Sequence, residues 1–285
     1  MALRGLSLVG FLDQTRAINY LRSTRPIAAT PLSDTDLIAE WNAAKAKIAA
    51  PPPRVGVPDI QPIPAAGAPY ITALQGQPWL SAILATPMYS NAAFQWIEID
   101  ALLAYQFQVD LDRSEFHCGA LTTPPTLGEL LNLCLPSNPP SEQYNISVNE
   151  YSAVIRARSL NLQVGPKGSL NPPQNTAFGI LLNVTLPLVH VTRFNGRCYL
   201  HNGYHRVYGA KLAGATHIPA ILRDTATAAD AGIRADGSTF DLALLESASP
   251  PTLAHLTPAV AHEIEMKAVH RVITITWTDH VVPDL

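Results

Sequence analysis

The chain has 285 residues, of which 47% are hydrophobic and 14% are charged, with 19 Lys and Arg against 22 Asp and Glu. Apolar content this high supplies a packed core and excludes a disordered chain, and the length fits one large domain or two small ones. The formal net charge of −3 argues against a dedicated nucleic-acid binder, which typically carries a basic surface. No stretch reaches the ~18 uninterrupted apolar residues of a membrane span, so we expect no membrane partner.

The first residues and the cysteines bear on where the chain works. Residues 1–12 carry one arginine and a short apolar stretch, but no small-residue cleavage site follows, so we expect no secretory signal peptide. Cys118, Cys134 and Cys198 show no C-x-x-C spacing. A sparse and odd number of cysteines fits reduced thiols, and the sequence therefore predicts a cytoplasmic protein.

The N-terminal part predicts a helix followed by an extended strap. Ser33 or Asp34 can cap a helix over residues 33–49, and the helix stops at the prolines that begin with Pro51. Seven prolines lie between residues 51 and 69. This density of proline predicts an extended segment that packs over the core.

The middle of the chain alternates between strand and helix patterns. Residues 94–100 alternate like a strand, and residues 105–110 do so again after a short helical turn at 101–104. A helix is predicted to begin after Thr126, because Thr126 and Glu129 match a capping box.

Two weaker patterns precede the clearest motif of the chain. Residues 147–163 fit a helix or a strand, and residues 165–175 predict a loop. Residues 188–194 and 197–201 are two β-prone runs, separated only by Asn195-Gly196. Both positions of a tight two-residue turn need positive φ, so Asn-Gly here strongly predicts a β-hairpin.

The rest of the chain adds two helices and two strands. A short helix over residues 205–213 is predicted to end at Gly214, and residues 218–222 form the next strand. Thr257 and Pro258 are typical of the first positions of a helix, here extending to Val269. A closing strand follows at residues 272–277, where apolar and polar residues alternate.

These elements predict an α/β (α+β) protein with a mixed-sheet core and helical and Pro-rich extensions. We expect residues 1–70 to form the N-terminal helical and Pro-rich extension and residues 71–224 to form the core. Residues 225–285 are expected to add a C-terminal helix and strand that pack on the core.

The turn between the second hairpin strand and the short helix has the chemistry of a phosphate cradle. The first N–H groups of a helix have no intrahelical partners, and the helix dipole favours an anion there. Arg206 adds a planar fork of donors, and His205 adds a donor that can be charged or neutral near pH 7. Gly203 lets a ligand approach the backbone closely.

This region resembles the central motif of the ParB/sulfiredoxin-like superfamily, in particular the ParB N-terminal-like domain. The similar residues are Gly203-Tyr204-His205-Arg206, the Ala-rich helix that ends at Gly214, and Ile218-Pro219. A weaker similarity covers Trp96 to Asp100 and Tyr105-Gln106, which resemble the first box of ParB domains. The resemblance implies a compact α/β fold that binds the phosphates of a nucleotide at this turn.

Three departures from the family pattern narrow the expected chemistry. Sulfiredoxins have a catalytic cysteine where this chain has Tyr204, so sulfinic-acid reduction is not expected. The free-serine-kinase branch has an aspartate where this chain has Asn202, which puts metal or proton handling there in doubt. The arginine-rich turn and basic recognition helix of chromosome-partitioning ParB proteins are absent from the sequence.

The resemblance and the cradle together define the candidate site residues. The expected nucleotide-binding residues are Asn202, Gly203, Tyr204, His205, Arg206, Lys211 and Gln106. The expected catalytic residues are Glu98, Asp100 and His205, with Mg²⁺ bridging the phosphates and no dedicated protein metal site.

Each of these assignments has a plainer alternative that the sequence leaves open. Glu98 and Asp100 fit ordinary strand-edge carboxylates, and Lys211 fits a solvated helix-face lysine. His205 and Arg206 fit a helix-capping pair bound to neighbouring carboxylates. Tyr204 fits a core aromatic as well as a residue that stacks on a base. Gln106 fits a residue that lines the pocket equally as well as one that does not.

The expected function is a nucleotide-dependent enzyme. It would bind ATP or CTP at the cradle and either hydrolyse it or transfer a phosphoryl group to a small hydroxyl substrate. The alternative is a non-catalytic nucleotide-sensing or interaction module, and a weaker one is a DNA-binding or nuclease relative. The nucleotide, the acceptor and the oligomeric state stay open at this point.

Overall fold

The computed structural model describes most of the chain as two compact units. The described residues are 2–26, 32–48, 54–138, 144–157, 162–170, 177–184, 187–268 and 271–278. The large unit comprises Met1–Pro139 and Pro187–Lys267, and the small unit comprises Pro140–Leu186 and Ala268–Leu285. This division does not coincide with boundaries at residues 70 and 224, because the small unit is inserted within the predicted core.

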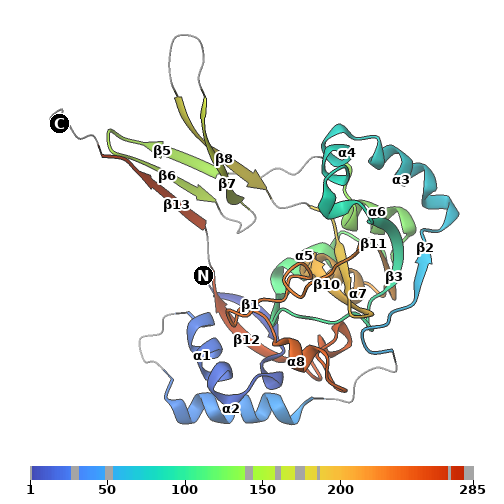
Figure 1. The fold of residues 1–285 in the computed structure, drawn as a ribbon. Coiled ribbons are helices and arrows are strands. Elements are labelled where there is room, and N and C mark those ends of the chain that lie inside the picture. The colour runs from blue at the N-terminus through green and yellow to red at the C-terminus, as the bar shows by residue number, and fades with distance from the viewer. Residues whose placement is uncertain are drawn as a thin grey trace. The chain divides into compact units, whose positions relative to one another are not determined.

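The centre of the large unit is a mixed five-stranded sheet in the order β10-β9-β11-β3-β2 (Figure 1). Its strands are β2 (Ile60–Pro62), β3 (Ala93–Glu98), β9 (His190–Phe194), β10 (Arg197–Asn202) and β11 (His217–Asp224). β11 runs parallel to β9, and the other neighbouring pairs are antiparallel. The predicted mixed α/β class is therefore confirmed.

The hairpin and the helix that follows it form as the sequence predicts. Asn195 and Gly196 have φ values of 49° and 74°, the conformation that a tight two-residue hairpin turn needs. β10 leads into α7 (Tyr204–Leu212), and Gly214 ends that helix with a φ of 95°. The predicted strands at residues 94–100 and 218–222 correspond to β3 and β11.

A second, three-stranded sheet of the large unit has the order β12-β1-β4. Its strands are β1 (Ala2–Ser7), β4 (Gln108–Asp110) and β12 (His262–Lys267), all antiparallel to their neighbours. The predicted helix from Pro258 to Val269 is therefore wrong. Only a single helical turn follows Thr257. The chain then continues as β12, on which the alternating residues Ile264 and Met266 point into the core and are buried.

Helices surround the sheets of the large unit. They are α1 (Gln14–Thr24), α2 (Asp34–Ala46), α3 (Ala68–Gln75), α4 (Pro78–Leu84), α5 (Leu111–Gly119), α6 (Leu127–Cys134) and the short α8 (Leu242–Leu245). Ser33, one of the two predicted caps, begins α2 with a capping box, and the predicted capping box at Thr126 begins α6. Within the predicted strap, residues 60–62 form β2 and residue 68 begins α3, while residues 51–53 lie outside the described residues.

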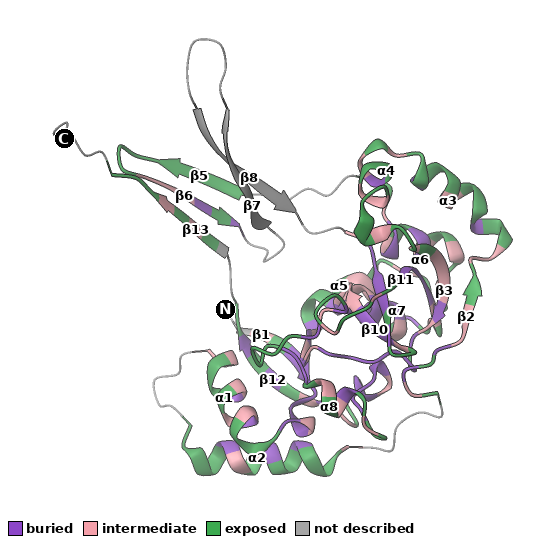
Figure 2. Cartoon of the chain, in the orientation of Figure 1, coloured by how far each residue is buried: buried purple, intermediate pink, exposed green. Residues whose placement is uncertain are grey.

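One continuous apolar core holds the large unit together (Figure 2). Tyr199, Tyr208 and Phe240 are among its largest fully buried side chains. The segment 101–104 is buried and begins with a single turn, in which the N–H of Leu102 donates to Ile99 O at 3.1 Å. Leu103 then forms β-bridges to Tyr199 and Thr252, so the predicted helical turn does not extend to residue 104.

The small unit consists of β-structure where it is described. β5 (Tyr144–Val148), β6 (Ser152–Ala157) and β13 (Arg271–Thr276) form one antiparallel sheet, and β7 (Leu162–Leu170) pairs with β8 (Ala177–Val184). The alternatives at residues 147–163 thus resolve to strands over most of their described residues. Residues 165–170 belong to β7, so the predicted loop is wrong there, and residues 171–176 lie outside the described residues.

Among the helices that the structure describes, none is long and apolar enough to cross a membrane.

Candidate functional site

The turn at Gly203 joins β10 to the first residue of α7. Gly203 has a φ of 101°, in the left-handed region that favours glycine. A methyl group at this position would also lie 2.8 Å from Val189 Cγ2. Glycine is therefore required at this position for two reasons, the backbone conformation and the close packing. The N-terminus of α7 has no side-chain cap.

Arg206 folds back over this turn. Its Nη2 atom lies 3.4 Å from the place where a Gly203 side chain would begin, and its Nη1 donates to the carbonyl oxygen of Pro187 and, at 3.5 Å, to that of Leu133. These acceptors are neutral, and no carboxylate of the described residues pairs with the guanidinium, contrary to the alternative of a capping pair bound to acids. Burial and Arg113 both lower the pKa of Arg206, while Cys134 acts in the opposite direction.

Helix α5 brings two further basic side chains to α7, where the two helices lie side by side (Figure 1). Arg113 and His117 are four residues apart and share one face of α5. The helices cross closely at Gly209, where a methyl group would lie 2.7 Å from Ser114 O and 2.8 Å from His117 Cβ. His205 precedes Gly209 by four residues and lies on the same face of α7.

Four basic side chains thus gather at the start of α7: Arg113, His117, His205 and Arg206, called the basic cluster below. The pKa values of His117 and His205 are lowered to about 4, first by burial and then by the neighbouring cationic groups. No carboxylate of the described residues is among the charges that act on these imidazoles or on Arg206. An anion placed here would relieve this repulsion and meet the free N–H groups of α7.

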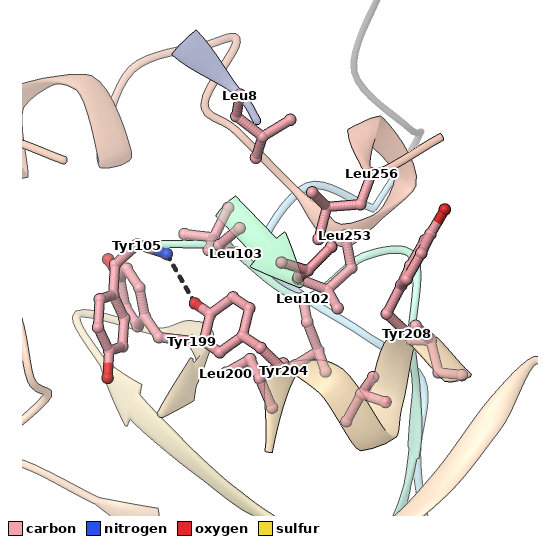
Figure 3. Packing of buried hydrophobic residues seen from close by; sticks show 14 of the residues in the cluster. Leu8, Leu102, Leu103, Tyr105, Tyr199, Leu200, Tyr204, Tyr208, Leu253 and Leu256 are labelled. Carbon is pink, nitrogen blue, oxygen red and sulfur yellow. Dashed lines mark hydrogen bonds between the residues drawn. The ribbon is translucent and has the colours of Figure 1, made fainter. Parts of the chain in front are cut away.

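Tyr204 belongs to the core, and its hydroxyl group contacts the backbone of residues 105 and 106. It is 3% exposed, and its hydroxyl oxygen accepts hydrogen bonds from the backbone N–H groups of Tyr105 at 3.0 Å and Gln106 at 3.4 Å (Figure 3). Of the two alternatives for Tyr204, the structure shows the core aromatic. Gln106 is fixed beside it through its backbone, and Asn202 Nδ2 donates to Leu188 O at 3.1 Å.

Lys211 and the two predicted catalytic carboxylates lie at the other end of α7. Lys211 Nζ is 2.6 Å from Asp100 Oδ1 and 2.8 Å from Leu253 O. Glu98 Oε2 accepts from the N–H of Asp59 at 2.9 Å and lies 3.5 Å from Arg54 Nη1. None of these contacts involves the basic cluster.

Strand order explains this separation. β3 runs antiparallel to β11, so Glu98 lies opposite His217 at the beginning of β11. β11 begins after the C-terminus of α7, a helix of nine residues and therefore about 13 Å long. The structure thus brings His205 and Arg206 together with Gly203, and brings Asp100 together with Lys211, as two separate groups.

Metal ligands do not gather at either group. Among the described residues, no set of three or more His, Cys, Asp or Glu side chains is placed to hold a metal ion. The described cysteines are free thiols, and Cys134 is fully buried with its pKa raised by burial to about 12. The guanidinium and imidazole groups of the basic cluster fit a phosphate group.

Sequence reasoning missed Arg113 and His117. The available signal was local: Asp110 caps α5, and Arg113 and His117 stand at the spacing that puts them on one helix face. That signal gives no partner, because the meeting of α5 with α7 depends on close packing at Gly209.

No family model, curated protein or solved structure matches the chain.

Proposed function

We propose that the chain binds the phosphate groups of a nucleotide, ATP or CTP, at the basic cluster. One observation carries this proposal: four basic side chains lie together beside α7, whose N-terminus has no side-chain cap, and no carboxylate of the described residues is among the charges acting on His117, His205 or Arg206. Such a site costs free energy without an anion, because the guanidinium groups of Arg113 and Arg206 repel each other and buried Arg206 loses its hydration. A phosphate offsets both costs.

The order of elements supports the proposed kinship with the ParB/sulfiredoxin-like superfamily. A hairpin strand, a glycine turn, a short helix and a further strand follow one another in the large unit as the resemblance requires. In such a fold the Gly203 turn and Arg206 would hold the phosphates. The three free cysteines support the cytoplasmic location that forms part of the same proposal.

For catalysis we propose His205 as the group that handles a proton. Its pKa of about 4 leaves the imidazole neutral near pH 7, and a phosphate bound beside it would raise that pKa towards the working pH, where the ring can accept a proton from an attacking water or hydroxyl group. Mg²⁺ bound to the nucleotide phosphates would supply charge stabilisation. The reaction would be hydrolysis or transfer of the phosphoryl group to a small hydroxyl substrate.

One observation favours the non-catalytic alternative. Glu98 and Asp100, expected to position a nucleophile, interact instead with Arg54, Asp59 and Lys211. A binding module that senses nucleotide without turnover needs neither carboxylate. Phosphate release from ATP or CTP with Mg²⁺ separates the two functions: turnover that His205→Gln abolishes supports the enzyme, and tight binding without turnover supports the module.

Calorimetric titration with ATP and CTP tests binding itself. Arg113 is exposed, so Arg113→Gln removes one charge of the cluster without disturbing the core. We expect this variant to bind about tenfold more weakly than the native chain, since one charge pair is lost. The matched control is Arg22→Gln, which removes an exposed arginine on α1 that pairs with Asp34.

The control variant is expected to bind like the native chain. Absence of binding by the native chain, or equal affinity of the Arg113→Gln and Arg22→Gln variants, would refute the assignment of the site. A DNA-binding relative would instead show salt-sensitive binding to duplex DNA, which the net charge of −3 opposes.

A further inference from the structure

A second group of basic side chains lies on the five-stranded sheet, outside the basic cluster. His190 opens β9, His201 lies near the end of β10, and Arg223 lies near the end of β11. The register of β10 against β9 is irregular between Leu200 and Asn202, which makes His201 the extra residue of a bulge. The His190 and His201 ring centroids are 4.9 Å apart.

Arg223 is a buried cation with neutral partners. It is 6% exposed, and its Nη2 donates to Asp230 O at 2.6 Å, while its Nε donates to His190 Nε2 at 3.1 Å. Among the described residues its other contacts are with the Met88 carbonyl at 3.5 Å and the face of Tyr89 at 5.8 Å, and no carboxylate pairs with it. A buried guanidinium without a counter-charge is strongly unfavourable.

The adjacent carboxylate does not supply that counter-charge. Asp224 follows Arg223 directly, but both of its oxygens bind Arg193, at 2.5 and 2.9 Å. The side chain of Asp230 accepts a hydrogen bond from Thr227, and only its backbone oxygen meets Arg223.

The tautomers of both histidines follow from their contacts. His190 Nε2 accepts from Arg223, so this nitrogen carries a lone pair. His201 Nδ1 is 3.1 Å from the carbonyl oxygen of Ala231, so this nitrogen carries the proton. The other nitrogen of His201, Nε2, is open in the sense that it has no hydrogen-bond partner among the described residues, and His201 is only partly buried.

The backbone fixes His201 in this orientation. Gly232 has a φ of 93°, and a methyl group there would lie 2.7 Å from His201 Nδ1. Glycine at this position lets the loop close against the edge of the imidazole. The open nitrogen is therefore preorganised rather than free to rotate.

Electrostatics keep both imidazoles neutral at pH 7. The pKa of His190 is lowered to about 2, first by burial and then by His201 and Arg223. Burial likewise lowers the pKa of His201, and Arg223 and Arg234 add to this, although the Ala231 carbonyl acts in the opposite direction. Arg234 is exposed and follows Gly232, which packs against His201, by two residues; its charge also acts on Tyr105.

We infer that His201 Nε2, Arg223 and Arg234 form a second binding site for an oxyanion, either a carboxylate or a phosphate group. The ligand supplies the counter-charge that buried Arg223 lacks, and His201 becomes protonated as it binds. A metal ion does not suit this place, because two guanidinium groups repel it and Arg223 already binds His190 Nε2. The site shares no residue with the basic cluster, so it stands independently of the proposed nucleotide binding.

Titration of the histidine rings by NMR tests this site residue by residue. The native chain is titrated with inorganic phosphate and, separately, with acetate, each at ionic strength held constant with chloride. We expect the pKa of His201 to rise on saturation with at least one of the two anions, and His201→Gln identifies its signal. The anion with the larger effect identifies the ligand class as phosphate or carboxylate.

Two variants complete the test. Arg234→Gln removes an exposed charge of the site and is expected to weaken this effect about tenfold, whereas Arg22→Gln is the matched control and leaves it unchanged. A His201 pKa that neither anion moves would overturn the second site. Equal responses of the two variants would do so as well.

Failure of the second site is distinguishable from failure of nucleotide binding. Nucleotide affinity depends on Arg113, while the His201 response depends on Arg234, and the two variants are read in separate assays.

Discussion

Replacement of Gly209 by alanine measures how closely α5 and α7 pack, and with it the geometry of the basic cluster. The new methyl group would lie 2.7 Å from Ser114 O and 3.2 Å from Cys118 N, both backbone atoms of α5. Backbone cannot swing aside as a flexible side chain can, so α5 must move away by several tenths of an ångström. Overpacking of this kind costs about 1–3 kcal/mol.

The higher helix propensity of alanine opposes this cost, and the balance of the two decides whether the free energy of unfolding rises or falls. Alanine is favoured over glycine inside a helix by about 1 kcal/mol. Gly128 in α6 provides the matched control, because a methyl group there would meet nothing within 4 Å. We therefore expect Gly128→Ala to raise the free energy of unfolding by up to about 1 kcal/mol and Gly209→Ala to lower it by about 1 kcal/mol.

Urea unfolding followed by tryptophan fluorescence gives this comparison. Trp41, Trp79 and Trp96 belong to the large unit, so the signal reports mainly on the part that contains both helices. Gly209→Ala should also weaken nucleotide binding, because it separates Arg113 and His117 from α7. A Gly209→Ala variant as stable as Gly128→Ala would refute the close crossing.

Three further results are expected. His117 and His205 have a pKa of about 4 in the folded chain and about 6.5 in the unfolded chain, so the unfolded chain binds more protons between these pH values. The free energy of unfolding is therefore lost as pH falls from about 6.5 to about 4. Urea midpoints measured across this range should decline, and they should decline less in the His117→Asn variant. Tyr204→Phe leaves the buried N–H of Tyr105 without its acceptor and should lower the unfolding free energy by about 1–3 kcal/mol without changing nucleotide affinity. Weaker nucleotide binding by this variant would instead indicate that the Tyr204 hydroxyl contacts the nucleotide. Lys211→Ala should destabilise the chain by about 1 kcal/mol and leave nucleotide affinity unchanged by calorimetry, and a loss of affinity would place the lysine in the site.

Local signals explain what could be predicted of the fold. The Asn195-Gly196 turn, the capping box at Thr126 and the stop at Gly214 each depend on residues adjacent in sequence. Their conformations follow from the intrinsic preferences of those residues, so no distant partner had to be known.

Distant pairing explains what could not be predicted. Thr257 and Pro258 do begin a helical turn, since the N–H of Ala261 donates to Thr257 O at 2.8 Å. The next residues then pair with β1, which lies at the other end of the sequence, and burial of Ile264 against the core outweighs the local helix signal. A single sequence does not show which strand will meet another so far away.

The residues of the candidate site also fall into those that a local pattern places and those that distant packing places. Gly203 and Arg206 carry a local pattern and lie where the pattern implies, at the start of α7. The expected approach of Glu98 to that turn depended on strand order, and the order β9-β11-β3 places Glu98 beyond the C-terminal end of α7 instead. Arg113 joins the cluster only through tertiary packing.

The ring titrations of His117 and His205, recorded by NMR with and without saturating nucleotide, test the basic cluster most directly. Without ligand both imidazoles should titrate near pH 4. A bound phosphate next to them favours their charged forms, so ATP or CTP should raise both pKa values by about one unit or more. Titration curves that nucleotide leaves unchanged would contradict phosphate binding at the start of α7.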